Sequence, residues 1–139
     1  MLIDSNSNIN INYNINLILK MRIWRKQIMA KIDLLEGFES EVERNPDSFL
    51  IPRKLMKNVR KLNVNPTVPM LYGIIATNQY QNVTSNIETL SEQTATDTKK
   101  ILKDVKQLQQ LGFVIEIKEG LNTMYQVNRY VDASLFGEE

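Results

Sequence analysis

The stretch that decides the fold is Ser85–Gln126, SNIETLSEQTATDTKKILKDVKQLQQLGFVIEIKEGLNTMYQ. It predicts a short helix that begins at a capping box, with Ser85 as the N-cap and Glu88 three residues later. Small and hydroxylated residues then predict a sharp turn. A second helix is predicted over Thr98–Leu111, with Asp97 as its N-cap. Two helices joined by a tight turn are therefore expected.

The second of these helices has one apolar face and a basic remainder. Its apolar residues recur at spacings of three and four, which places them on one stripe facing a core: Ile101, Val105, Leu108 and Leu111. Its four lysines lie off this stripe, at positions 99, 100, 103 and 106, and only Asp97 and Asp104 oppose their charge. The helix is expected to present a positive surface to solvent.

A β-hairpin is predicted directly after this helix. Gly112 suits the left-handed backbone that ends a helix. Residues 113–117 and 123–127 are rich in β-branched and aromatic residues and flank turn residues at 118–122. Val83 is expected to begin a short strand that pairs with the hairpin. The fold class predicted is α+β, mainly α, and the order of elements is typical of a winged helix-turn-helix.

Composition excludes several classes of function. The 139 residues include no Cys and no His, which removes thiolate sites and the commonest metal ligand and general base. No phosphate-binding glycine motif occurs, so we expect no enzyme, cofactor or metal. The formal net charge is only +1, so binding of nucleic acid must depend on where the charges lie. No apolar run spans a membrane and no secretion signal is evident, so the cytoplasm is expected.

The N-terminal part predicts two further elements. Residues 1–16 alternate Asn with apolar residues, which is consistent with a strand or with disorder. Residues 17–47 are expected to contain a long helix as an N-terminal extension of the winged-helix domain. Such a helix either covers the core of its own domain or pairs with the same helix of a second subunit, and dimerisation is favoured. Membrane-surface binding by its basic side is a third use. The apolar stripe assigned to dimerisation is Met21, Trp24, Ile28, Ile32 and Leu35.

The middle of the chain predicts a basic helix and a core helix. After a boundary at Asn45–Ser48, a helix over Arg53–Leu62 carries five basic residues and no acidic one. A nearly all-apolar helix then begins at Asn65-Pro66, and Gly73 within it is expected to let another helix approach closely. Residues 48–130 are assigned to the DNA-binding domain. The tail, 131–139, is expected to pack back or to join a dimer interface.

The order of these motifs resembles a known family. Ser48–Met56 (SFLIPRKLM), Leu71–Ile75 (LYGII), Leu90–Thr94 (LSEQT) and Leu108–Val114 (LQQLGFV) are similar to the N-terminal winged-helix domain of DnaD-like primosomal proteins and of Gram-positive plasmid and phage replication initiators. The resemblance implies dimerisation through that domain. Those proteins carry a further C-terminal domain, whereas this sequence stops at Glu139, which favours a regulator or a partition adaptor over helicase loading.

The function expected is therefore that of a dimeric double-stranded-DNA-binding protein, which regulates transcription or serves plasmid or phage replication or partition. Thr98, Lys99 and Lys103 are expected to meet base edges, and Lys100 and Lys106 to meet phosphates. Further contacts are assigned to Lys118 and Asn122 at the hairpin tip, to Arg129, and to Arg53, Lys54 and Lys57. The alternative is a winged-helix adaptor for another protein, with Leu102 exposed on the second helix as its contact.

Overall fold

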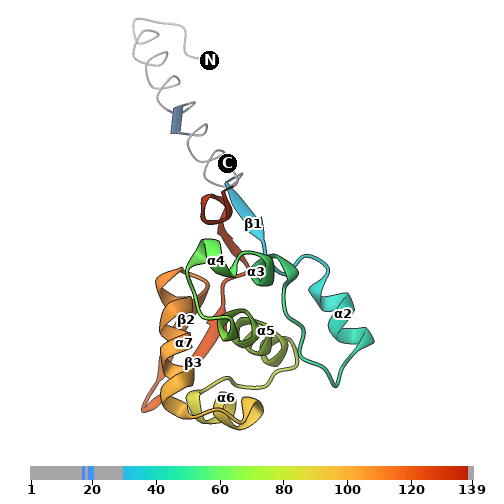
Figure 1. Ribbon diagram of the computed structural model, residues 1–139, viewed down its shortest axis with the longest axis vertical. Helices are drawn as coiled ribbons and strands as arrows, with labels where there is room; N and C mark the ends of the chain where they lie inside the picture. The colour runs from blue at the N-terminus through green and yellow to red at the C-terminus, as the bar shows by residue number, and fades with distance from the viewer. Residues whose placement is uncertain (1–16, 18, 21–29, 138–139) are drawn as a thin grey trace, which may run out of the picture.

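The long apolar helix α5 (Thr67–Tyr80) lies at the centre of the molecule, and the other elements pack around it (Figure 1). The computed structural model describes residues 17, 19, 20 and 30–137. Every residue of α5 from Leu71 to Asn78 is buried. A helix covered on all sides needs apolar residues on all sides, which explains why this segment lacks an amphipathic pattern.

The described elements give a mixed fold in which helix predominates, as expected for the α+β class. They are β1 (Lys31–Asp33), α2 (Phe38–Arg44), α3 (Arg53–Lys57), α4 (Val59–Leu62), α5, α6 (Ile87–Thr94), α7 (Thr98–Gln110), β2 (Val114–Glu119), β3 (Asn122–Val127), β4 (Tyr130–Asp132) and the 3-10 helix η1 (Ala133–Phe136). The strands form two antiparallel pairs, β1 with β4 and β2 with β3.

The second helix and the hairpin agree with the prediction. Asp97 occupies the N-cap position of α7, although its carboxylate makes no capping hydrogen bond, and the predicted stripe is buried at Ile101, Val105 and Leu108. Gly112 has the expected positive φ of 77°. The hairpin turn is shorter than predicted, because Glu119 pairs with Asn122 and leaves only two residues between the strands. Gly120, with φ 61°, begins that turn, as tight hairpin turns require.

The capping box predicted at Ser85 is wrong. Asn86 is the N-cap of α6, and its side chain accepts a hydrogen bond from the Thr89 amide at 2.8 Å. Ser85 is buried, its hydroxyl bonds Asn78, and its carbonyl accepts from the Tyr125 amide. A strand beginning at Val83 was expected to pair with the hairpin. The bond between Tyr125 and Ser85 is made in that region, but residues 83–85 do not form a strand. Contacts with distant segments thus decide which polar residue caps the helix.

The later part of residues 17–47, where one continuous helix was predicted, contains the strand β1 followed by the separate helix α2. Ile32 lies in β1, which pairs with β4, and Leu35 follows in a turn and is buried in the core. Apolar spacing alone suits a short strand and turn as well as a helix, and pairing with β4, about 100 residues later, decides between them. These two residues are therefore not on a free dimerisation face. Leu17, Leu19 and Lys20 are helical.

Other parts of that assignment lie outside the described residues. These are the alternating segment 1–16 and the dimerisation residues Met21, Trp24 and Ile28. The boundary predicted at Asn45–Ser48 does form a turn, but it does not divide the packing, because α2 contributes Phe38 and Val42 to the common core. The tail packs back through Phe136, whose ring stacks on Phe113 at 6.0 Å between centroids.

Gly73 permits a close approach, but the neighbour is not a helix. A Cβ atom at this position would lie 2.1 Å from the carbonyl oxygen of Leu50. The extended segment that leads into α3 therefore crosses α5 directly over this glycine. The basic helix predicted beyond that segment is interrupted at Asn58, which separates α3 from α4.

Replacing Ala95 by glycine is expected to stabilise the fold by roughly 0.5 kcal/mol. Ala95 ends α6 in the left-handed region, with φ 51°. That conformation costs an L-residue roughly 1–2 kcal/mol, and the greater freedom of glycine in the unfolded chain offsets only part of the gain. Urea unfolding monitored by circular dichroism measures the change. Ala76→Gly, within the buried part of α5, is the control and should destabilise; a loss of the same size at position 95 would contradict the assignment.

Candidate nucleic-acid interface

The outward side of α7 carries a stripe of free basic side chains. Lys99, Lys103 and Lys106 are exposed, and helical spacing places them opposite the buried stripe of Ile101, Val105 and Leu108. Thr98 is exposed at the first position of the helix. Within residues 30–137 none of these three lysines forms an ion pair. Their charge is therefore available to a partner.

Lys100 has a different role from the one predicted. Its ammonium donates to Asp104 at 2.8 Å and to the hydroxyl of Thr67 at 2.9 Å. Its amine is therefore directed at the start of α5 and away from the stripe of free lysines. The spacing of four residues between Lys100 and Asp104 is the signal in the sequence that could have indicated this pair.

Asp104 is the centre of a polar network that fixes α7 against α5. Its carboxylate is 2% exposed and also accepts hydrogen bonds from Thr67 at 2.6 Å and from Asn65 at 3.2 Å. Burial raises the pKa of Asp104, but hydrogen bonds from Lys100, Thr67 and Asn65 outweigh burial and hold the pKa below its ordinary value. Gln107 adds a contact one turn later by accepting from the Asn65 amide at 3.0 Å. The orientation of the exposed lysines thus depends on this network.

A second network, which sequence reasoning missed, fixes α6. The side-chain amides of Asn78 and Gln93 pair reciprocally, at 2.8 and 2.9 Å, between α5 and α6. Asn78 is 1% exposed, so both of its polar atoms need partners. Because α5 also contains Thr67, Thr77 and Gln79, Asn78 gave no distinct signal in the sequence. The pair holds α6, and through it the turn that leads into α7.

The hairpin tip lies at the end of the molecule where α7 begins (Figure 1). Lys118 and Asn122 are exposed close to the tip, on β2 and β3. Leu121, in the turn itself, is fully exposed. The hairpin tip and the first turn of α7, which holds Thr98 and Lys99, therefore lie at the same end of the molecule.

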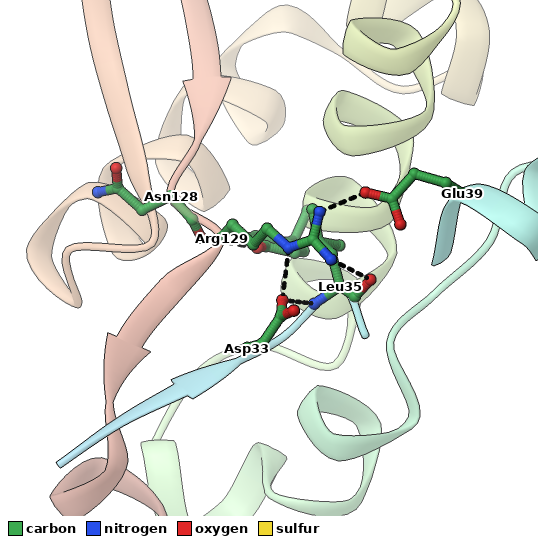
Figure 2. Close-up of polar contacts among 6 residues, drawn as sticks. Asp33, Leu35, Glu39, Asn128 and Arg129 are labelled. Atoms are coloured by element: carbon green, nitrogen blue, oxygen red, sulfur yellow. Dashed lines mark hydrogen bonds and ion pairs between the residues drawn. The ribbon is translucent and has the colours of Figure 1, made fainter. Parts of the chain in front are cut away.

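Arg129 is engaged within the protein, contrary to the DNA contact assigned to it. Figure 2 shows its guanidinium between Asp33, Glu39 and the carbonyl of Leu35. The bond to Asp33 is 2.8 Å long, and this hydrogen bond lowers the pKa of Asp33. The acidic partners come from the N-terminal part of the chain, about 90 residues away, so no local pattern could indicate them. Arg129 joins the base of the hairpin to β1 and α2.

The other basic residues assigned to DNA lie in a separate group. Arg53 and Lys57 are exposed on α3, whereas Lys54 is half-buried with its ammonium 5.6 Å from the centre of the Phe136 ring. Figure 1 shows α3 and α4 toward the end of the molecule opposite the hairpin tip. The candidate residues thus form two surfaces, one on α7 and the hairpin and one on α3 and α4.

Among the residues that the structure describes, no group of three acidic side chains is arranged to hold a metal ion. In the same ranges no helix is both long and apolar enough to cross a membrane. Comparisons with protein-family models, curated proteins and solved structures find no match.

Proposed function

We propose that the chain is a winged helix-turn-helix protein that binds double-stranded DNA, with α7 as its recognition helix and the β2–β3 hairpin as its wing. The observation that supports this most is the stripe of exposed, unpaired lysines on α7, next to an exposed hairpin tip. The order α6, turn, α7, hairpin is that of the winged helix-turn-helix class. Binding, rather than catalysis, is the activity proposed.

An α-helix with its side chains is about 10–12 Å wide, which fits a major groove about 12 Å wide. In this position Thr98 and Lys99 meet base edges at the first turn of α7, and Lys103 follows one turn later. Lys106 reaches the phosphates, and Lys118 and Asn122 reach the backbone beside the groove. α7 contains no Arg, the commonest bidentate reader of guanine, so moderate sequence specificity is expected.

The biological role proposed is regulation of transcription, or replication or partition of a plasmid or phage. Two-fold symmetric DNA sites are read by dimers, so homodimerisation is part of the proposal. The residues proposed for that contact, Met21, Trp24 and Ile28, lie outside the described part of the chain.

The variant Lys99→Ala/Lys103→Ala tests the DNA interface. Both side chains are exposed, so the variant should fold normally, whereas its affinity for a 30-base-pair duplex should fall roughly 10- to 100-fold. Removing two cationic side chains from the interface should also lower the salt dependence by roughly 1–2 log units per decade of salt. Fluorescence anisotropy at two salt concentrations measures both quantities.

The matched control for that variant is Lys31→Ala/Arg44→Ala, which removes the same charge from β1 and α2. Its DNA affinity should change less than threefold. Unchanged affinity in Lys99→Ala/Lys103→Ala, with folding confirmed by circular dichroism, would contradict the proposal.

The alternative function is that of a protein-interaction adaptor. Leu102 on α7 and Ile115 on β2 are 39% and 43% exposed, and Leu121 is fully exposed. A contiguous patch of exposed apolar side chains marks a site of contact with another protein. Retention of full DNA affinity in the double lysine variant would favour this function.

A further inference from the structure

The surface formed by α3 and α4 is basic, and it belongs to a long stretch of sequence that contains no acidic residue. No acidic residue occurs between Asp47 and Glu88. Arg53, Lys57 and Arg60 are exposed, and none of them forms an ion pair within residues 30–137. Such a concentration of positive charge repels itself, and an anionic partner relieves the repulsion.

The surface is also held rigidly in shape. Leu55 and Leu62 anchor α3 and α4 in the core, at 2% and 8% exposed. Lys61 donates to the carbonyl of Phe136 at 3.1 Å. Between the exposed side chains lies a shallow depression of about 370 Å³, lined by Arg53, Lys54, Lys57 and Asn58. The helices that carry these basic groups are already anchored, so binding a phosphate there requires no ordering of the backbone.

The position of this surface relative to α7 indicates what it binds. The hydrogen bond from the Asn65 amide to Gln107 connects the chain just after α4 to the C-terminal half of α7. Figure 1 shows α4 beyond the end of α7 that lies away from the hairpin tip. The 13 residues of α7 span about 20 Å, the length of roughly six base pairs along a duplex. The α3–α4 surface is therefore joined to the C-terminal half of α7, whereas Thr98 and Lys99 lie at the other end of that helix.

We propose that the α3–α4 surface is a second phosphate-binding surface, which holds the backbone of the DNA duplex that flanks the segment bound by α7. This inference rests on the proposed function. A duplex is favoured as the occupant because it is the anionic partner proposed for α7, and the chain just after α4 is joined to the C-terminal half of that helix. The surface recognises phosphates without reading sequence, and it lengthens the bound segment beyond what a single recognition helix covers.

The test compares two duplex lengths in the full chain. The variant Arg53→Gln/Lys57→Gln/Arg60→Gln should bind a 12-base-pair duplex within twofold of the unmodified protein. On a 30-base-pair duplex its affinity should fall at least tenfold, and the salt dependence should fall by roughly 2–3 log units per decade of salt. Lys31→Gln/Arg44→Gln is the control and should leave both affinities within threefold. Anisotropy measures affinity, and thermal unfolding confirms that each variant folds.

The other outcomes overturn the inference in distinguishable ways. Equal losses on the two lengths would mean that α3–α4 belongs to the same site as α7. No loss on either length would mean that the surface does not bind DNA, and an acidic protein partner would then be the alternative. The proposed function fails separately, if Lys99→Ala/Lys103→Ala keeps full affinity for both duplexes.

Discussion

Gly73→Ala is expected to lower the free energy of unfolding by about 2–4 kcal/mol. The added methyl group would lie 2.1 Å from the Leu50 carbonyl oxygen and 3.0 Å from the Ile51 Cα, and both neighbours are backbone atoms. The crossing segment cannot move aside freely, because Leu50 packs against the core and Pro52 is buried. Overpacking a core costs typically 1–3 kcal/mol and occasionally more, and the better helix propensity of Ala returns less than about 1 kcal/mol.

Urea unfolding measures this loss, and Gly37→Ala is its control. Gly37 has a φ of 74°, and a Cβ atom there would have no neighbour within 4 Å. Alanine at position 37 therefore carries the backbone strain of about 1 kcal/mol without a steric clash. If Gly73→Ala loses no more stability than Gly37→Ala, the close contact does not constrain the fold.

Asp104→Leu is expected to cost about 2–4 kcal/mol of stability and to weaken the DNA binding proposed for α7 as well. The substitution removes the acceptor for Thr67, Asn65 and Lys100. Each lost hydrogen bond to a charged group is worth about 1.5–3 kcal/mol, although Lys100 is 38% exposed and regains water. Chemical unfolding measures the stability. An unchanged midpoint of unfolding would show that the network does not hold α7.

Asp104→Asn keeps the shape of the side chain and removes only the charge, so it separates the two contributions. The native pKa of Asp104 lies below the ordinary value of 3.8. Ionised Asp104 therefore stabilises the fold fully above pH 3.8, and this stabilisation is lost as the pH falls through the lower native pKa. Unfolding of Asp104→Asn should accordingly depend less on pH below about 4 than unfolding of the unmodified protein does. Identical acid profiles would contradict the assignment.

The sequence predicts α7 and the hairpin well because local signals agree there. Asp97, the apolar stripe ending near Leu111 and the stop at Gly112 all indicate one helix, and the β-branched runs that follow can form only one hairpin. The exposure of Lys99, Lys103 and Lys106 follows from the same periodicity. Their exposure needs no information from distant residues, whereas the orientation of α7 against α5 depends on the contacts of Asp104 with Thr67 and Asn65.

The predictions for Ser85, Ile32 and Arg129 are wrong because contacts with distant parts of the chain determine the structure at these positions. Ser85 and Asn86 are both good N-caps, and bonds to Asn78 and Tyr125 remove the first from consideration. Ile32 joins a strand because β4 is available to pair with it. Arg129 resembles any basic residue near a hairpin until Asp33 and Glu39 are placed beside it. Long-range ion pairs and strand pairing leave no trace in local spacing.

The pairing of β1 with β4 also determines where an experimenter can attach something to this protein. The chain enters the described domain at Ala30, immediately before β1, and Figure 1 shows β1 at the end of the molecule remote from the hairpin tip. Arg129, which directly precedes β4, holds β1 in place through its ion pair with Asp33. A fluorophore or a surface tether attached at Lys31, which is exposed on β1, would leave Thr98 and the hairpin tip accessible. Immobilisation through that end therefore suits kinetic measurements of duplex capture.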